Sequence, residues 1–216
     1  MDKKDNKAEN AVLVDLNEVD ELWLRAKQPK YKLRMRNTLR QLLKNSGIRE
    51  GHMLEISPGK GGLGHYFPAF TQTCLHYGGA IKKEEGHVVI VGDISQCPHI
   101  PDNSFDVIFS LQVFEHVKEP WRAAAEIKRI LKPGGLTFHS APFSWRYHPH
   151  PVDFWRFSPD ALEFLFSGLK CIYKKFDIVE RRRNATRLST NDIPLDVLGG
   201  WRENIRVSYA GIKVHE

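Results

Sequence analysis

The sequence has few cysteines and no long apolar run, and these two shortages exclude several classes of protein. Its three cysteines, Cys74, Cys97 and Cys171, lie far apart and form no CxxC pair. They are too scattered for a disulfide framework or a zinc knuckle, so we expect reduced thiols in a cytoplasmic protein. The apolar run Val88–Val91 falls far short of the roughly 20 residues that span a bilayer, and no membrane partner is predicted. The charged amino-terminal sequence also lacks the apolar core of a secretory signal.

Charge of one sign dominates only part of the chain. The 216 residues are 41% apolar and 27% charged, with a formal net charge of +6. This balance is typical of a globular protein large enough to bury a full core. Residues 27–49 hold eight basic side chains and no acidic one. A nucleic-acid domain usually concentrates its charge further and interleaves aromatic residues, so a solvated surface is the favoured interpretation and a nucleic-acid partner the alternative.

The apolar patterns divide the chain into three parts. Residues 1–10 are polar and predict a disordered tail. Residues 11–50 predict an N-terminal helical extension in which Pro29 interrupts the first helix. Residues 51–216 alternate strands with helices, and the strands are almost continuously apolar. This alternation predicts an α/β domain with a parallel sheet and helices on both faces. The expected strands are 52–57, 87–93, 105–110, 136–141, 171–180 and 205–214, and the expected helices are 121–131 and 158–167, with Ser158 as N-cap.

A glycine-rich turn follows the first expected strand. Gly59 and Gly61 would let the backbone approach a ligand closely, ahead of a helix N-terminus that offers backbone N–H groups. Lys60 is not followed by Ser or Thr, so the turn is not a GxxxxGK[ST] phosphate loop. Glu55, at the end of the strand, would face the ligand and repel a pyrophosphate. It predicts a ligand with a cationic group, such as an amino group.

Further segments follow this turn in a fixed order: GDI at 92–94, PDNSFDVIFS at 101–110, EHV at 115–117 and LKPGG at 131–135. Together with the glycine turn, they resemble the class I S-adenosylmethionine-dependent methyltransferases, and more narrowly the methyltransferase type 11 group. The resemblance covers about residues 53–165. It implies a Rossmann-like, mostly parallel seven-stranded sheet, with S-adenosyl-L-methionine as cofactor and S-adenosyl-L-homocysteine as product.

The resemblance also implies which residues bind the cofactor. Glu55 would steady the loop and the methionine amino group, Asp93 would lie near the adenine amino group, and Ile94 would cover the ring. Ser57 stands where the family usually has its first glycine, and we expect it to fit if its backbone angles are ordinary. The other implied residues lie in the loop or follow the fourth strand, near the reacting methyl: Ser57, Pro58, Gly59, Gly61, Ser110, Leu111 and Gln112.

One expected carboxylate is missing. The family usually has an acidic residue at the end of its second strand, where it binds both ribose hydroxyls. The matching stretch here, Tyr77–Ile81, has none, and Glu84 or Glu85 could substitute from just downstream. The gap keeps open a second alternative, a non-catalytic binding protein of methyltransferase fold.

The loop after the fifth strand contains the candidate acceptor residues. Ligands of open α/β folds bind at this edge of the sheet, and His148, His150 and, after the fourth strand, His116 are candidate general bases. Asp153 and Arg156 are expected to form a salt bridge that fixes the loop. A metal bound by His148, His150 and Asp153 is a minority interpretation, and no metal site is predicted.

Aromatic residues of the same loop suggest how an apolar acceptor would be held. Trp145, Tyr147, Phe154 and Trp155 could form a wall against it, and packing on the rim of the sheet is an equally good explanation.

These observations predict an S-adenosylmethionine-dependent methyltransferase that acts on an oxygen or nitrogen of a small molecule. The sulfonium supplies the leaving group, so the protein has to orient the acceptor and remove its proton. A nucleic-acid or protein methyltransferase is the alternative that the basic residues at 27–49 motivate. The Asn-Pro-Pro-Tyr type of signature of base-amino methyltransferases is absent, since Ser110–Val113 stands in its place.

Overall fold

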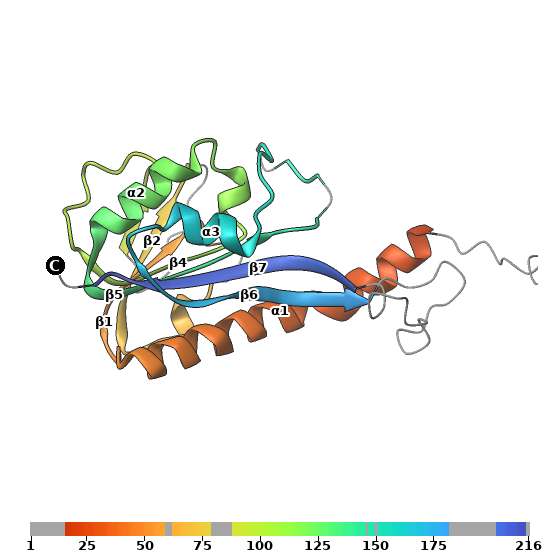
Figure 1. Cartoon of the computed structure of the whole chain (residues 1–216), viewed down its shortest axis with the longest axis horizontal. Coiled ribbons are helices and arrows are strands. Elements are labelled where there is room, and N and C mark those ends of the chain that lie inside the picture. The colour runs from red at the N-terminus through yellow and green to blue at the C-terminus, as the bar shows by residue number, and fades with distance from the viewer. Residues whose placement is uncertain are drawn as a thin grey trace, which may run out of the picture.

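The protein is a three-layer α/β structure built on one sheet (Figure 1). The computed structural model describes residues 16–58, 62–78, 88–145, 147–149, 151–181 and 202–214, so the tail expected at 1–10 lies outside it. The strands are β1 (Gly51–Ile56), β2 (Phe70–His76), β3 (Val88–Val91), β4 (Phe105–Leu111), β5 (Leu131–Pro142), β6 (Lys170–Arg181) and β7 (Arg202–Ile212). The helices are α1 (Leu16–Ser46), α2 (Pro120–Ile130) and α3 (Pro159–Leu165), with 3₁₀ turns η1 (Gly64–Tyr66) and η2 (Phe114–His116).

The order of the strands confirms the predicted Rossmann-like fold. The seven-stranded sheet runs β3-β2-β1-β4-β5-β7-β6. The first five strands of the chain pair in parallel, and only β7 runs antiparallel to its neighbours β5 and β6. The order reverses at β1, whose neighbours are β2 on one side and β4 on the other. In an open α/β sheet, a ligand binds in the crevice beyond the carboxyl ends of the strands at such a reversal.

Helices cover both faces of the sheet, as expected: α2 and α3 lie on one face and α1 on the other (Figure 1). Alternate residues of β4 serve the two cores, because successive side chains of a strand point to opposite faces. Ile108 packs in the cluster with Ile127 of α2, while Phe109 packs in the cluster with Leu39 and Leu43 of α1. Among the residues described, no helix is long and apolar enough to cross a membrane.

Local signals set the start of α3 as predicted. Ser158 is the N-cap, and its Oγ accepts a hydrogen bond from the backbone N–H of Ala161 at 3.1 Å. Pro159 occupies the first helical position, where its missing N–H leaves no hydrogen bond unmade. The cap therefore fixes where the loop after β5 ends.

Two local predictions were wrong. Pro29 does not interrupt the first helix, because α1 runs unbroken from Leu16 to Ser46. A proline removes one backbone hydrogen bond, and the turns on either side of it can continue the helix. The glycine turn is also not followed by an α-helix: only the short turn η1 separates it from β2. β2 itself, at Phe70–His76, lies earlier than the stretch compared with the family's second strand.

Candidate functional site

A cavity of about 500 Å³ opens where the order of the strands reverses. Its walls come from the carboxyl ends of four parallel strands and from two loops. Ile56 and Ser57 follow β1, Tyr77 follows β2, and Asp93 follows β3. Gln112 follows β4. The cavity lies in the size range of small-molecule and cofactor sites, at the place where this fold binds them.

Two residues on the rim have unusual backbone angles. Ser57 has φ 48° and Gln112 has φ 57°, both in the left-handed region that favours glycine. Both line the cavity. Ordinary backbone angles, the condition on which Ser57 was expected to fit, are therefore not met. A non-glycine residue there costs about 1 kcal/mol or more, and such strain clusters at ligand sites.

Glu55 steadies the loop after β1, as one part of its predicted role requires. Its side chain is buried, and its two carboxylate oxygens accept hydrogen bonds from the backbone N–H groups of Leu63 and Gly64, each at 2.9 Å. A Cβ added at Gly62 would stand 2.6 Å from Glu55 Oε2, so glycine is needed there for the loop to close on the carboxylate. Glu55 is not among the residues that line the cavity, and its contact with a methionine amino group stays a prediction.

Asp93 and Ile94 form the wall beyond β3. Asp93 is exposed, and one of its oxygens, Oδ1, accepts a hydrogen bond from Ser95 N at 2.8 Å, which closes a tight turn. Ile94 is buried and lines the cavity beside it. Below the turn, Cys97 Sγ donates to Asp93 O at 2.8 Å, and burial raises the pKa of this thiol to about 11. An anionic side chain beside an apolar one suits an adenine with its exocyclic amino group.

The three residues expected after the fourth strand lie in different places. Ser110 is fully buried, with its Oγ 2.8 Å from Nδ1 of His139, whose pKa burial lowers to about 3. Leu111 packs against the core under α1. Neither is placed on the cavity wall. Gln112 does line it, held by a hydrogen bond from its Nε2 to Tyr31 Oη and one from Arg206 Nε to its Oε1, both 3.2 Å long.

Hydrogen bonds join the loop after β5 to η2. Phe154 N donates to Glu115 O at 2.7 Å, and Trp155 Nε1 donates to Val117 O at 3.0 Å. His116 Nδ1 lies 2.7 Å from Val152 O. Because a carbonyl oxygen only accepts, the proton of His116 sits on Nδ1. The loop therefore forms the second wall of the cavity, which His116, Val152 and Phe154 line.

The predicted salt bridge between Asp153 and Arg156 is confirmed. Arg156 Nη1 and Nη2 donate to the two oxygens of Asp153 at 2.5 and 2.7 Å, and Arg156 Nε donates to Trp145 O at 3.0 Å. These hydrogen bonds outweigh burial and hold the pKa of Asp153 well below its usual range. Asp153 also accepts from His148 N at 2.8 Å, so the pair fixes the position of His148.

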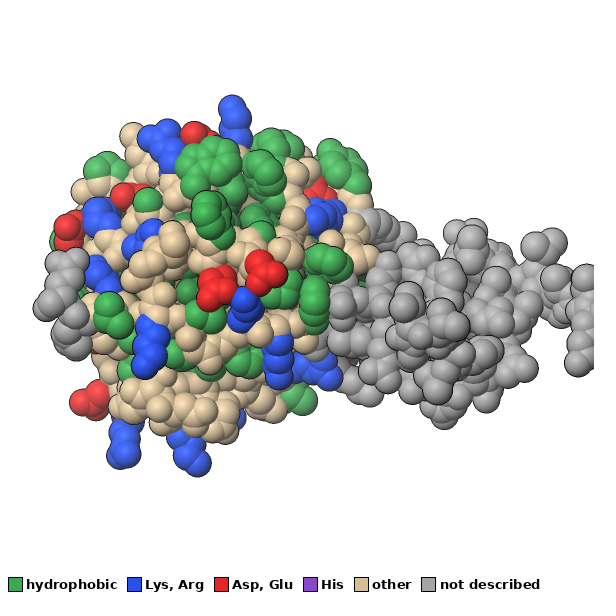
Figure 2. Space-filling view, viewed as in Figure 1, with side chains coloured by type: hydrophobic (Ala, Val, Ile, Leu, Met, Phe, Trp, Pro, Cys, Tyr) green, Lys and Arg blue, Asp and Glu red, His purple; other side chains and the backbone are tan. Residues whose placement is uncertain are grey.

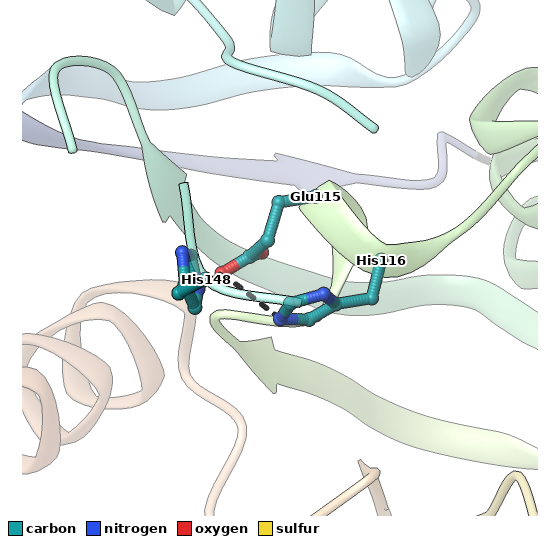
Figure 3. A group of neighbouring side chains, drawn as sticks. All are labelled: Glu115, His116 and His148. Atoms are coloured by element: carbon teal, nitrogen blue, oxygen red, sulfur yellow. Dashed lines mark ion pairs between the residues drawn. The ribbon is translucent and has the colours of Figure 1, made fainter. Parts of the chain in front are cut away.

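Glu115 is a second buried carboxylate in this region. It is fully buried, and neither of its oxygens has a hydrogen-bond partner among the residues described. Burial raises its pKa to about 8. Its Oε1 lies 3.7 Å from His148 Nε2 and 3.9 Å from His116 Nε2. Figure 3 shows the three side chains turned toward one another. The sequence drew attention to the two histidines as candidate bases and to Glu115 only as the neighbour of His116.

Several predicted residues lie outside the part of the chain that the structure describes: Gly59, Gly61, Glu84, Glu85 and His150. Pro58 is described but does not line the cavity. Of the four aromatic residues, only Phe154 does. Tyr147 is exposed, and Trp145 lies under Arg206, whose guanidinium is 4.9 Å from its ring centre.

Sequence reasoning missed the polar residues between η2 and the first turn of α2. Lys118, Glu119 and Arg122 line the cavity. The signal for them was their place: they follow the EHV segment beyond β4, at the same edge of the sheet as Gln112. Elsewhere, Lys and Arg side chains are scattered over the face seen in Figure 2 and do not gather into one patch.

Comparison with known proteins also points to a methyltransferase, the class that the sequence predicted. Residues 68–139 match the methyltransferase domain family known as Methyltransf_11. The chain is 33% identical over 88 residues to an uncharacterized methyltransferase of Mycolicibacterium gilvum, a match that covers 35% of this chain and 34% of that protein. It is 32% identical over 116 residues to the sterol 24-C-methyltransferase of Pneumocystis carinii, covering 47% and 30%. The matches thus span about a third of these curated relatives.

Solved structures share the fold across most of the chain. One is a chain of the complex between the Haloferax volcanii Trm112 methyltransferase activator and a methyltransferase, with a TM-score of 0.60, 20% identity, and coverage of 92% of this chain and 98% of that one. Another is phosphoethanolamine N-methyltransferase 2 of Haemonchus contortus in complex with S-adenosyl-L-methionine, with a TM-score of 0.55, 16% identity, and coverage of 83% and 53%.

The strand order defines a Rossmann-like α/β fold with a cavity at the reversal of that order. The family match, the relatives and the fold together support a class I S-adenosylmethionine-dependent methyltransferase domain, as the sequence predicted. S-adenosyl-L-methionine, the cofactor that the sequence predicted, is the ligand bound in the Haemonchus contortus structure.

Proposed function

We propose that the protein transfers the methyl group of S-adenosylmethionine to an oxygen or nitrogen of a small molecule. The observation that carries the proposal is the cavity at the reversal of the strand order, with Asp93 and Ile94 on one wall and His116 on the other. Its volume of about 500 Å³ suits a nucleoside-sized ligand together with a small acceptor. Its chemistry fits as well, since a carboxylate oxygen, an apolar side chain and an amide line one hollow.

Different residues around the cavity would bind different parts of the cofactor. Asp93 would accept a hydrogen bond from the adenine amino group, because its Oδ1 already takes Ser95 N and its second oxygen is exposed with the side chain. Ile94 would pack on the ring. Ser57 and the loop that Glu55 steadies would hold the methionine end. When bound, S-adenosylmethionine supplies an activated methyl group, so the protein needs no group that forms a covalent intermediate.

His116 is the better placed of the described candidate bases. It lines the cavity, whereas His148 does not, and its Nδ1 proton is committed to Val152 O. Its Nε2 is therefore the unprotonated nitrogen, which is the form in which an imidazole accepts a proton. Removing the acceptor's proton in this way typically contributes about 10²–10⁴-fold to a rate. The hydrogen bond to Val152 keeps the ring oriented for that role.

A calorimetric titration with S-adenosylhomocysteine tests the cofactor site. We expect binding by the wild type and at least about tenfold weaker binding by Asp93→Ala, because the variant loses one charge-assisted hydrogen bond to the ligand. Asp102→Asn is the matched control: Asp102 pairs with Arg129 at 2.6 Å in the following loop and does not line the cavity. Absence of binding by folded wild type would overturn the proposal and favour the non-catalytic alternative.

A transfer assay with methyl-labelled S-adenosylmethionine tests the acceptor class. Small phenols, carboxylates and amines form one panel, and RNA and a basic protein form the second. The proposal expects labelling within the first panel and a large loss of the rate constant in His116→Gln, with little change in cofactor affinity. Labelling only of RNA or protein would favour the alternative, a nucleic-acid or protein methyltransferase, which the basic residues of α1 motivate.

A further inference from the structure

Three metal-ligating side chains converge at the edge of the cavity (Figure 3). Glu115 and His116 come from η2, and His148 comes from the loop after β5, more than thirty residues further along the chain. One donor atom from each lies within 4.8 Å of the other two. The sequence separation means that packing of the loop on η2 creates the cluster.

The hydrogen bonds around the two imidazoles turn their acceptor nitrogens inward. His116 Nδ1 donates a hydrogen bond to Val152 O at 2.7 Å. His148 Nδ1 lies 3.1 Å from Asp153 Oδ2, which favours its proton on that nitrogen. The Nε2 atoms of both rings then face Glu115 Oε1, at 3.9 and 3.7 Å. An imidazole that ligates a metal usually has its other nitrogen held by a carbonyl or carboxylate in this way.

Glu115 supplies a second and independent observation. It is fully buried, and both of its oxygens lack a hydrogen-bond partner among the residues described. A buried carboxylate is costly unless a cation or hydrogen-bond donors compensate it. The positive charges of Arg156 and Arg206 favour the ionised carboxylate, but burial outweighs them and raises its pKa. A buried carboxylate with no hydrogen-bond partner among the described residues thus lies beside one ligand nitrogen of each of two histidines.

We propose that Glu115, His116 and His148 bind a divalent transition-metal ion, with Zn²⁺ the best match to two imidazoles and one carboxylate. Bonds of about 2.0–2.2 Å in a tetrahedral arrangement separate ligand atoms by roughly 3.4 Å. The distances from Glu115 Oε1 to the two imidazole nitrogens, 3.7 and 3.9 Å, are slightly longer, so small side-chain movements bring them into range. This set differs from the one weighed in the sequence, since Asp153 is engaged by Arg156.

The site also narrows the chemical class of the methyl acceptor, and this inference rests on the proposed function. Three protein ligands leave one position of a four-coordinate ion for an outside donor. His116 brings the site to the cavity wall, and with its Nε2 bound to the ion the metal replaces this histidine as the group that activates the acceptor. An acceptor that offers a hydroxyl or carboxylate oxygen could take that position, and the metal would lower the pKa of a hydroxyl bound there.

The test uses the full-length protein, stripped with a chelator and titrated with Co²⁺, which has visible absorption in a tetrahedral site, and in parallel with Zn²⁺. We expect saturable binding of one ion and displacement of Co²⁺ by Zn²⁺. Glu115→Gln and His148→Ala should each weaken binding by at least about tenfold. His52→Gln, at the opposite end of β1, is the control and should bind as the wild type does. Circular dichroism checks that each variant is folded.

Each outcome decides for or against the site. Absence of saturable Co²⁺ binding, or equal binding by wild type and folded Glu115→Gln, overturns the proposal and leaves a shared proton in place of the metal. S-adenosylhomocysteine is titrated into the same samples. Its binding without Co²⁺ binding removes the metal site alone, and Co²⁺ binding without it removes the cofactor site alone.

Discussion

Glu55, near the end of β1, and Glu115, in η2 beyond the neighbouring strand β4, are two buried carboxylates that differ in what compensates their burial. Glu55 accepts hydrogen bonds from two backbone N–H groups at 2.9 Å. Glu115 has no hydrogen-bond partner among the residues described and faces two imidazole nitrogens. A satisfied buried carboxylate holds the fold together, whereas an unsatisfied one is retained at a cost to stability. We therefore infer a structural role for Glu55 and, under the metal-site proposal, a binding role for Glu115.

The largest effect is expected from Glu55→Gln. The substitution replaces an acceptor oxygen by an NH₂ group that meets the backbone donors of Leu63 and Gly64, and it removes the charge from these hydrogen bonds. We expect a loss of about 2 kcal/mol in the free energy of unfolding, measured in urea. A loss below experimental error would mean that the loop does not depend on the carboxylate.

Gly62→Ala probes the same contact from the side of the loop. The added Cβ would stand 2.6 Å from Glu55 Oε2, so the loop or the carboxylate has to move. We expect a loss of about 1–2 kcal/mol. In a Glu55→Ala background the clash is absent, and the same substitution should cost much less. Equal costs in both backgrounds would contradict the close packing inferred here.

Asp106 is a partly exposed carboxylate, and its substitution gives a reference for the stability effects of substituting Glu55 and Glu115. Burial would raise its pKa, but hydrogen bonds from Lys132 Nζ and His52 N, both 2.7 Å, outweigh burial and lower it. A carboxyl group with a lowered pKa contributes stability above its unfolded pKa of about 3.9 and loses it as the pH falls. We expect Asp106→Asn to cost up to about 1 kcal/mol at pH 7 and less at pH 3, in urea titrations at the two values.

The smallest effect on stability is expected from Glu115→Gln in metal-free protein. No hydrogen bond to the carboxyl group is lost, and a pKa raised to about 8 leaves the group mostly uncharged at neutral pH, as glutamine is. The free energy of unfolding should change by less than about 0.5 kcal/mol, or rise. Paired with Glu55→Gln under identical conditions, this variant separates the two roles. A loss as large as that of Glu55→Gln would reveal a structural partner of Glu115.

Most of the fold could be predicted because its signals are local. The apolar strands, the helix expected at 121–131 and the Ser158 cap are each signalled within a few residues. β2 escaped notice since its residues, Phe70–His76, mix polar and apolar side chains. The continuity of α1 through Pro29 departs from the local rule for proline, on which the prediction rested.

The site was predictable only where a side chain follows directly from its strand. Asp93, Ile94 and Gln112 lie at the cavity because they end parallel strands. Ser110 lies at the end of β4, but its side chain turns toward His139 of β5 and not toward the cavity. Which face of the sheet a side chain takes depends on its place in the alternation of the strand, and that place was not predicted. The cluster of Glu115 with His148 depends on how a loop some thirty residues away docks on η2, which no pattern along the chain encodes.

A crystal structure of the protein with S-adenosylhomocysteine tests the central claim most directly. The account predicts the ligand in the cavity at the reversal of the strand order, with its adenine beside Asp93 and Ile94 and its amino-acid end toward the loop that Glu55 steadies. A ligand bound elsewhere, or no binding by a folded protein at saturating concentration, would contradict it.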